Sequence, residues 1–219
     1  SVELYLIRHG QSENNARPEH LRVEDALLTE LGHQQADLLA QWVKTVELDR
    51  LFSSPFRRAL QTAWPIQQAS GVPVEVLVPL HEVGGCMSGP GPDNFVGCPG
   101  IRRSELLEEF PGYQVPEEID QTGWWKSKPA EDDQQVHQRA TDVLDWVRQE
   151  FAAGQDKVGF VMHADVTRHL LNNVARVTSE HSHRILYNTS VTRLSIEGEQ
   201  LALELYNSIS HLPMSLTSR

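Results

Sequence analysis

Apolar and polar residues follow one another in blocks that predict strands followed by helices. Residues 2–7 form an apolar run that is typical of a buried strand. Residues 29–46 place Leu31, Leu38 and other apolar side chains at helical spacing, with Thr29 positioned as an N-cap. The chain therefore opens with a buried strand, a polar loop and an amphipathic helix.

The same alternation continues to the end of the chain. Further strands are expected at 48–52, 74–78 and 158–162, and further helices at 136–151 and 166–177. Ser54 and Pro55 are expected to cap and begin another helix, which Pro65 kinks or ends. A hairpin is expected over 191–206. Strands that alternate with helices favour a mainly parallel sheet covered on both faces, and the late hairpin would add an antiparallel edge. We therefore expect a three-layer αβα fold of the α/β class.

One stretch, residues 84–130, breaks this periodicity. Gly, Pro, Cys and Asp crowd its first half, and residues 102–110 could form a short helix. A connection of this length is unusual in a compact domain, so we expect a single domain over residues 1–219 with a functional insertion or lid at about 84–130. Trp124 and Trp125 could close over a substrate, but burial in a small core of the insertion is the favoured interpretation.

Composition and charge narrow the classes of partner. At 219 residues, 39% hydrophobic and 22% charged, the composition is that of an ordinary globular protein. A net charge of −11 argues against nucleic acid or an anionic membrane as a partner, because both would repel the chain. No apolar run approaches the roughly 18 residues that span a bilayer, and two cysteines are too few for a disulfide scaffold. A cytoplasmic location is expected.

Charged or titratable residues follow three of the predicted strands. Arg8 and His9 follow the first strand, Arg58 lies shortly after the second, and His163 directly follows the strand at 158–162. The carboxyl ends of parallel strands meet at one edge of a sheet, which is where open α/β sheets bind their ligands. Each residue alone could be an unrelated surface group, but three such strand ends together predict a site with guanidiniums beside a nucleophile, as phosphoryl transfer requires.

Several segments carry a resemblance to a known family. The run RHGQSENN at residues 8–15 resembles the opening signature of the histidine phosphatase superfamily, also called phosphoglycerate mutase-like. Residues 28–36 resemble that family's Leu-(Ser/Thr)-x-x-Gly-x-x-Gln-Ala helix start. Residues 53–63 resemble its Ser-(Ser/Asp)-x-x-x-Arg-Ala-x-x-Thr-Ala segment, which selects Arg58 and leaves Arg57 to face solvent.

Two further positions match the family. Glu82 follows Leu80 with one residue between them, as the family's proton donor does. His163 follows an apolar strand, as the family's second histidine does. Ala164 and Asp165 come next where the family usually has Gly, which adds a negative charge near an anion site.

The resemblance implies a phosphomonoester hydrolase that acts through a phosphohistidine on a small phosphorylated metabolite. It implies His9 as the nucleophile, Glu82 as the proton donor and His163 as a further catalytic residue. The implied phosphate-binding residues are Arg8, Asn15, Arg58 and His163. No metal or other cofactor is expected, because guanidiniums supply the positive charge.

Two alternative functions stay open at this point. A phosphoglycerate mutase would usually continue the acid segment as Glu-Arg-x-Tyr-Gly, whereas Val83-Gly84-Gly85-Cys86 follows Glu82 here, and residues 188–192 with Asn207 and His211 resemble phosphatase-type members. A non-catalytic binder of phosphorylated ligands would be expected to lack His9 or Glu82, and both are present. His181 and His183, two residues apart, could belong to a metal site, but a solvated loop is the favoured interpretation.

Overall fold

The chain forms a six-stranded sheet in the order β3-β2-β6-β1-β7-β8. The computed structural model describes residues 1–173 and 185–219. The strands of this sheet are β1 (Val2–Arg8), β2 (Arg50–Ser53), β3 (Val74–Val76), β6 (Asp156–Met162), β7 (Val191–Glu197) and β8 (Gln200–Ser208). Strands β3, β2, β6 and β1 are parallel, β7 is antiparallel to β1, and β8 is antiparallel to β7. The predicted parallel sheet with an antiparallel edge is confirmed.

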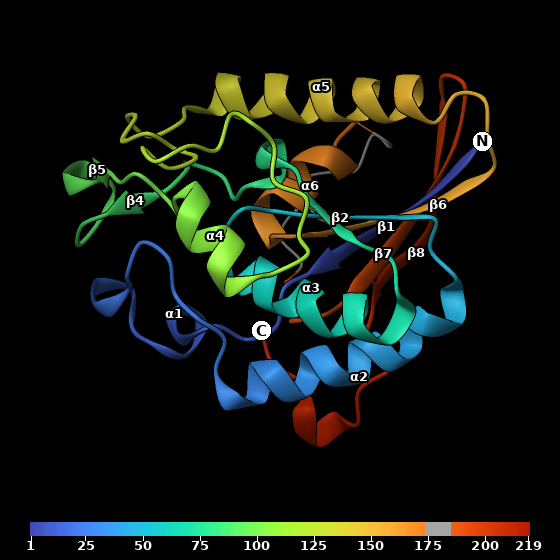
Figure 1. Cartoon of the computed structure of the whole chain (residues 1–219), viewed down its shortest axis with the longest axis horizontal. Coiled ribbons are helices and arrows are strands. Elements are labelled where there is room, and N and C mark those ends of the chain that lie inside the picture. The colour runs from blue at the N-terminus through green and yellow to red at the C-terminus, as the bar shows by residue number, and fades with distance from the viewer. Residues whose placement is uncertain (174–184) are drawn as a thin grey trace.

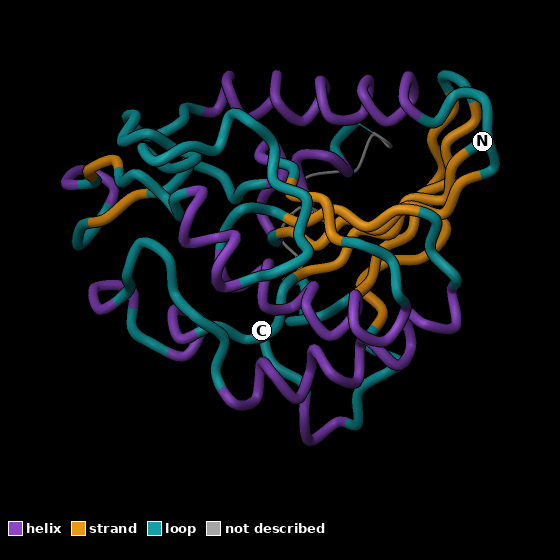
Figure 2. The backbone as a smooth tube through the Cα atoms, viewed as in Figure 1, coloured by secondary structure: helices purple, strands orange, loops and turns teal. Residues whose placement is uncertain are grey.

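Helices cover both faces of the sheet, α2 and α3 on one face and α5 and α6 on the other (Figures 1 and 2). The helices are α1 (Glu13–Ala16), α2 (Glu30–Val46), α3 (Arg57–Ser70), α4 (Arg103–Glu109), α5 (Asp133–Glu150) and α6 (Ala164–Leu171). Strand β1 shows why both faces are covered: Tyr5 and Ile7 pack with α2 and α3, whereas Leu4 and Leu6 pack with α5 and α6. No helix in the described ranges is long and apolar enough to cross a membrane.

Helix α3 differs from its prediction at its start and in its middle. It begins at Arg57 rather than after Ser54, and it continues through Pro65 to Ser70. Proline costs a helix one hydrogen bond. Here the buried face of α3, which includes Ala59 and Ile66, keeps the helix together through tertiary packing. The predicted helix at 166–177 appears as α6, and its expected end after residue 173 lies outside the described residues.

Residues 84–130 form a layer that packs on the α3 side of the molecule. Within it, β4 (Met87–Ser88) pairs with β5 (Val96–Gly97), and α4 follows. The Tyr113 hydroxyl donates to the Leu60 carbonyl of α3 at 2.6 Å. Trp124 and Trp125 are buried, and the Trp124 ring contacts that of Phe56 with centroids 4.9 Å apart. The two tryptophans therefore belong to a core that this segment shares with α3.

Arg57 does not face solvent as predicted. Its guanidinium binds Asp25 at 3.0 Å, Glu105 at 3.2 Å and Glu109 at 2.8 Å. Glu105 and Glu109 lie one helical turn apart on α4, so one guanidinium can reach both. Arg57 thus joins the segment 84–130 to α3 and to the loop that carries Asp25.

The loop after β1 passes very close to the first turn of α2. A Cβ atom at Gly32 would lie 2.0 Å from the Gln11 carbonyl oxygen, and one at Gly10 would lie 2.6 Å from the Gly32 oxygen. The Gly10 amide donates to Thr62 Oγ1 at 3.0 Å, and the Gln11 amide donates to Gln35 Oε1 at 2.9 Å. The segments at 28–36 and 53–63 therefore hold the backbone of the 8–15 segment.

We expect Gly32→Ala to destabilise the protein. In an ordinary helix, replacing Gly by Ala raises the free energy of unfolding by about 1 kcal/mol. Here the added methyl would meet backbone atoms that cannot move aside, with a cost of about 1–3 kcal/mol. Urea denaturation would measure the change. Gly91→Ala is the control, because nothing lies within 4 Å of a Cβ there; a Gly32→Ala variant as stable as wild type would contradict the close approach.

Candidate active site

The residues predicted to form the site meet at the carboxyl edge of the parallel strands. Arg8 ends β1, His9 follows it, and His163 directly follows β6. The rings of His9 and His163 lie with centroids 5.2 Å apart. Arg58, in the first turn of α3, places its Nε 3.3 Å from His9 Nε2. Register explains this convergence, because Arg8 pairs with Met162 on neighbouring parallel strands.

A pocket of about 250 Å³ reaches this cluster at Arg58. Residues around η1 (Glu19–Leu21) and residues of the β4–β5 hairpin line it. Arg58 and Glu82, which we call its floor, line it as well. The other described residues that line it, which we call its mouth, are Asn14, Glu19, Arg22, Val23, Glu24, Phe56, Val83, Gly84, Gly85, Met87, Gly89, Pro90 and Phe95. The mouth therefore combines apolar side chains with two carboxylates and one guanidinium.

The imidazole of His9 is held in one tautomer. Its Nδ1 lies 2.6 Å from the Gly10 carbonyl oxygen, which can only accept a hydrogen bond. Nδ1 must therefore carry the proton, and Nε2 carries a lone pair. Arg58 Nε donates toward that lone pair. Nε2 is the atom of His9 able to act as a nucleophile.

Both imidazoles are kept neutral by their surroundings. Burial lowers the pKa of His9 well below its ordinary value, and the charges of Arg58 and Arg8 lower it further. Burial and Arg58 have the same effect on the pKa of His163. The lone pair of His9 is therefore available even at weakly acidic pH.

The two guanidiniums of the site have no carboxylate partner among the described residues. Arg8 Nη1 donates to the Leu186 carbonyl, while its buried Nε has no partner in the described part of the chain. Neither Arg8 nor Arg58 forms an ion pair with a carboxylate of a described residue. Burial lowers the pKa of Arg8 to about 10, so it remains charged at neutral pH. This arrangement favours an anionic ligand.

The Glu82 carboxyl group lies against the first turn of α6. Its Oε1 accepts from the Val166 amide at 2.9 Å and from the Val83 amide at 2.8 Å, and its Oε2 accepts from the Asp165 amide at 3.1 Å. Burial raises the pKa of Glu82, and the charge of Asp165 raises it further, against the lowering effect of these amides. Glu82 is therefore a carboxyl group suited to holding a proton in the pocket.

The structure adds residues that the sequence did not single out. Ser54, expected to cap a helix, places its Oγ 2.7 Å from His163 Nε2 instead. The Asn188 side chain donates to the His9 carbonyl and to Asn15 Oδ1, both at 3.3 Å. Ser54 lies in the matched segment 53–63, but the contact with His163 spans more than a hundred residues, so no local pattern could reveal it.

Asn15 lies in α1, directly after the loop that carries His9. Its Oδ1 accepts from the Ser12 amide and hydroxyl, both at 3.0 Å, and so caps α1. His181 and His183 lie outside the described residues. Among the residues described, no three His, Cys, Asp or Glu side chains form a group that could hold a metal ion.

Comparison with known proteins identifies the family. The model of the histidine phosphatase superfamily (branch 1) matches residues 4–209. The chain belongs to this superfamily, and the resemblance seen in the sequence is confirmed. A solved structure of a phosphoserine phosphatase mutant from Entamoeba histolytica, in complex with phosphoserine, has a similar fold: the TM-score is 0.67 at 22% identity, covering 97% of this chain and 100% of that one.

Curated relatives match over shorter stretches. The chain is 31% identical over 116 residues to the "Probable phosphoglycerate mutase GpmB" of Photorhabdus laumondii, which covers 52% of this chain and 54% of that protein. It is 40% identical over 73 residues to phosphoserine phosphatase 1 of Hydrogenobacter thermophilus, and this match covers 33% of this chain and 35% of that protein. The matches thus span about a third to a half of these relatives. A phosphatase or a mutase is consistent with them.

We expect inorganic phosphate or orthovanadate to raise the melting temperature through Arg58. An anion that binds only the folded protein adds about 2.7 kcal/mol of stability at a hundredfold excess over its Kd. Arg58→Met should abolish most of this shift. Arg57→Met is the matched control: it loses three carboxylate contacts, which lowers the starting melting temperature, but should keep the shift. An equal shift in both variants would show that the anion binds elsewhere.

Proposed function

We propose that this member of the histidine phosphatase superfamily hydrolyses small phosphomonoesters through a phosphohistidine on His9. The observation that carries the proposal is the lone pair of His9 Nε2, which lies 3.3 Å from Nε of Arg58, a residue that lines the pocket. No carboxylate of a described residue is paired with Arg8 or Arg58. A phosphate dianion placed there would meet both the nucleophile and the charge that stabilises the transferring phosphoryl group.

In the first step, Nε2 of His9 attacks phosphorus in line with the ester oxygen. The N–P bond forms as the P–O bond to the alcohol breaks. Arg8, Arg58 and His163 bind the equatorial oxygens, and Asn15 adds a hydrogen bond; guanidiniums suit this because their planar forks pair with two oxygens at once. Glu82 gives its proton to the leaving alkoxide, which departs as the alcohol.

In the second step, the Glu82 carboxylate takes a proton from water. The water oxygen bonds to phosphorus as the N–P bond breaks, which releases inorganic phosphate and regenerates neutral His9. Glu82 ends the cycle protonated, so both steps are balanced in protons. Positive charge comes from Arg8 and Arg58 throughout, and we propose that no metal ion takes part.

The pocket mouth favours hydrolysis over mutase activity. A mutase must also hold a second anionic group of its substrate. Beyond Arg58, the described residues of the mouth supply one guanidinium, Arg22, and the two carboxylates of Glu19 and Glu24. Mutase activity is tested by adding a phosphoglycerate with and without its bisphosphate, and a non-catalytic binder would turn over neither.

We also propose that the segment 84–130 acts as the specificity insertion of a single domain. It contributes Met87, Pro90 and Phe95 to the pocket mouth, where the group attached to the phosphate would lie. The floor recognises phosphate, so this segment would determine which ester enters.

His9→Ala should abolish turnover and phosphoenzyme formation, because the Nε2 lone pair of His9 lies beside Arg58, whereas Nε2 of His163 is hydrogen-bonded with the Ser54 hydroxyl. A panel of phosphate esters would be assayed for phosphate release in the presence of EDTA, and the phosphoenzyme would be trapped by acid quench and detected by mass spectrometry. Normal turnover by His9→Ala would contradict the covalent mechanism. Activity lost in EDTA and restored by a metal would contradict the metal-free account.

Glu82→Gln should lower kcat/KM for an alkyl phosphate by about a hundred- to ten-thousandfold, and for nitrophenyl phosphate far less. Nitrophenolate needs little protonation to depart, and kcat/KM reports only the steps up to phosphoryl transfer. In the wild type, kcat/KM for the alkyl ester should fall as the pH rises through the raised pKa of Glu82, because the acid must carry its proton. Equal slowing of both esters would remove Glu82 from this role.

A further inference from the structure

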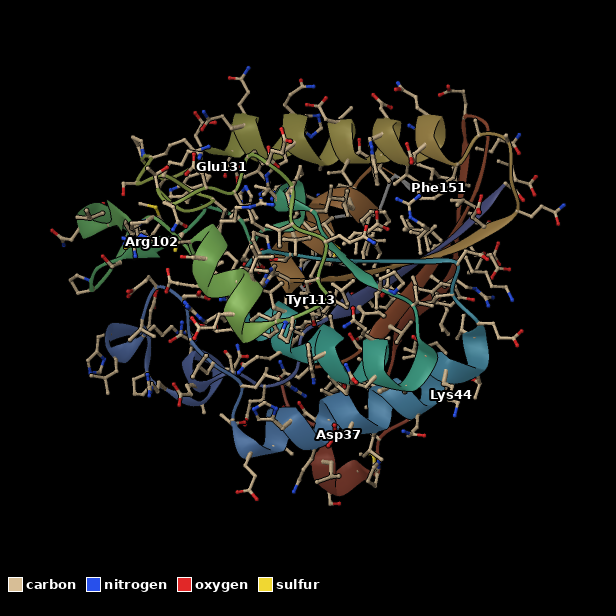
Figure 3. All side chains as sticks on the ribbon, in the orientation of Figure 1. Asp37, Lys44, Arg102, Tyr113, Glu131 and Phe151 are labelled. Carbon is tan, nitrogen blue, oxygen red and sulfur yellow. The ribbon has the colours of Figure 1, made fainter. Side chains whose placement is uncertain are left out.

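A bidentate ion pair lies behind the segment that carries Glu82. Arg139, on α5, donates from Nε and Nη2 to the two carboxylate oxygens of Glu131, both at 2.7 Å. Their side chains are only 12% and 7% exposed. Glu131 lies just before the start of α5, close to the segment 84–130 (Figure 3). Neither residue lines the pocket with Arg58 and Glu82, so neither is placed to touch a substrate.

This pair binds the backbone on both sides of Glu82. Arg139 Nη1 donates to the carbonyls of Pro79 at 2.7 Å and His81 at 2.9 Å, before Glu82. After it, the Gly84 amide donates to Glu131 Oε1 at 3.3 Å, and the Glu131 amide donates to the Gly84 carbonyl at 3.0 Å. Residues 79–84 are therefore fixed at both ends by one ion pair.

The other contacts of this segment are local turns and side-chain packing. It lies between η2 (Val78–Leu80) and the segment 84–130, and Gly84 and Gly85 both have positive φ angles. The His81 amide donates to the Val78 carbonyl at 3.0 Å and the Gly85 amide to the Glu82 carbonyl at 3.2 Å. The His81 ring packs against Trp124 and Trp125, with centroids 5.2 and 5.3 Å away. The carboxyl group of Glu82 reaches α6 only if its backbone keeps this path.

We propose that Glu131 and Arg139 form a positioning pair that fixes the Glu82 carboxyl group for proton transfer to the leaving group. The inference rests on the proposed function, in which Glu82 is the acid. Replacing a buried ion pair by apolar residues is often neutral or stabilising, so stability alone is a weak explanation for this pair. Proton transfer, in contrast, requires the acid within hydrogen-bond reach of the leaving oxygen.

The test compares two esters in variants of the pair. Arg139→Met and Glu131→Gln should lower kcat/KM for an alkyl phosphate at least about tenfold more than for nitrophenyl phosphate, a part of the full effect of a general acid. Arg139→Lys keeps the positive charge but loses the bidentate guanidinium. Its ratio of kcat/KM for the two esters should lie between that of Arg139→Met and that of the wild type. A role in folding alone would slow both esters by the same factor, and that result would overturn the proposal.

Arg50→Met is the matched control. Arg50 forms the same kind of bidentate pair, with Glu75 at 2.6 and 2.7 Å, but joins β2 to β3 away from the pocket. This variant should keep the wild-type ratio between the two esters. If Arg139→Met does not fold, the comparison of Arg139→Lys and Glu131→Gln with Arg50→Met decides the question.

A second measurement does not depend on activity. The Val166 amide donates to Glu82 Oε1, so its hydrogen exchange reports whether that carboxyl group is in place. In Arg139→Met it should exchange at least about tenfold faster, while amides of β1 and β6 keep their protection. Unchanged exchange at Val166 would overturn the positioning role. If the wild type releases no phosphate from any ester, the proposed function fails, and faster exchange at Val166 would still show that the pair positions Glu82.

Discussion

Two guanidiniums that form no ion pair with a described carboxylate are the constraint on which this site depends. Arg8 is buried, and Arg58 faces the pocket beside His9. Burial lowers the pKa of His9 and of His163, and the positive charge of the guanidiniums lowers both further and favours the neutral imidazoles. We infer that this charge also makes the pocket favour an anion in a chain of net charge −11. In the proposed function, the same charge therefore both prepares the nucleophile and attracts the group it attacks.

The backbone around this cluster is fixed by other contacts. The loop after β1 is held by Thr62, Gln35 and Asn188, each through a hydrogen bond to the main chain. It passes so close to Gly32 that a side chain there would meet the Gln11 carbonyl. Side chains in the loop can then be placed for chemistry, because its position is already determined by these contacts.

The proposed acid is positioned differently from the proposed nucleophile. His9 follows directly from a central strand, whereas Glu82 lies in a short irregular segment that binds α5 and α6. In the proposed function, the sheet therefore holds the nucleophile, and segments outside the sheet hold the acid and line the pocket mouth.

The sequence alone determined the strands of the six-stranded sheet and most helices, because these follow from local periodicity, and the family motif at residues 53–63 selected Arg58 over Arg57. It also brought His9, Arg58 and His163 to one edge of the sheet, since parallel strands end together. Only the tertiary structure decided that α3 continues past Pro65, that Arg57 binds three carboxylates and that Glu131 and Arg139 hold residues 79–84. These outcomes depend on contacts between segments far apart in the chain, and such contacts leave no local pattern to recognise.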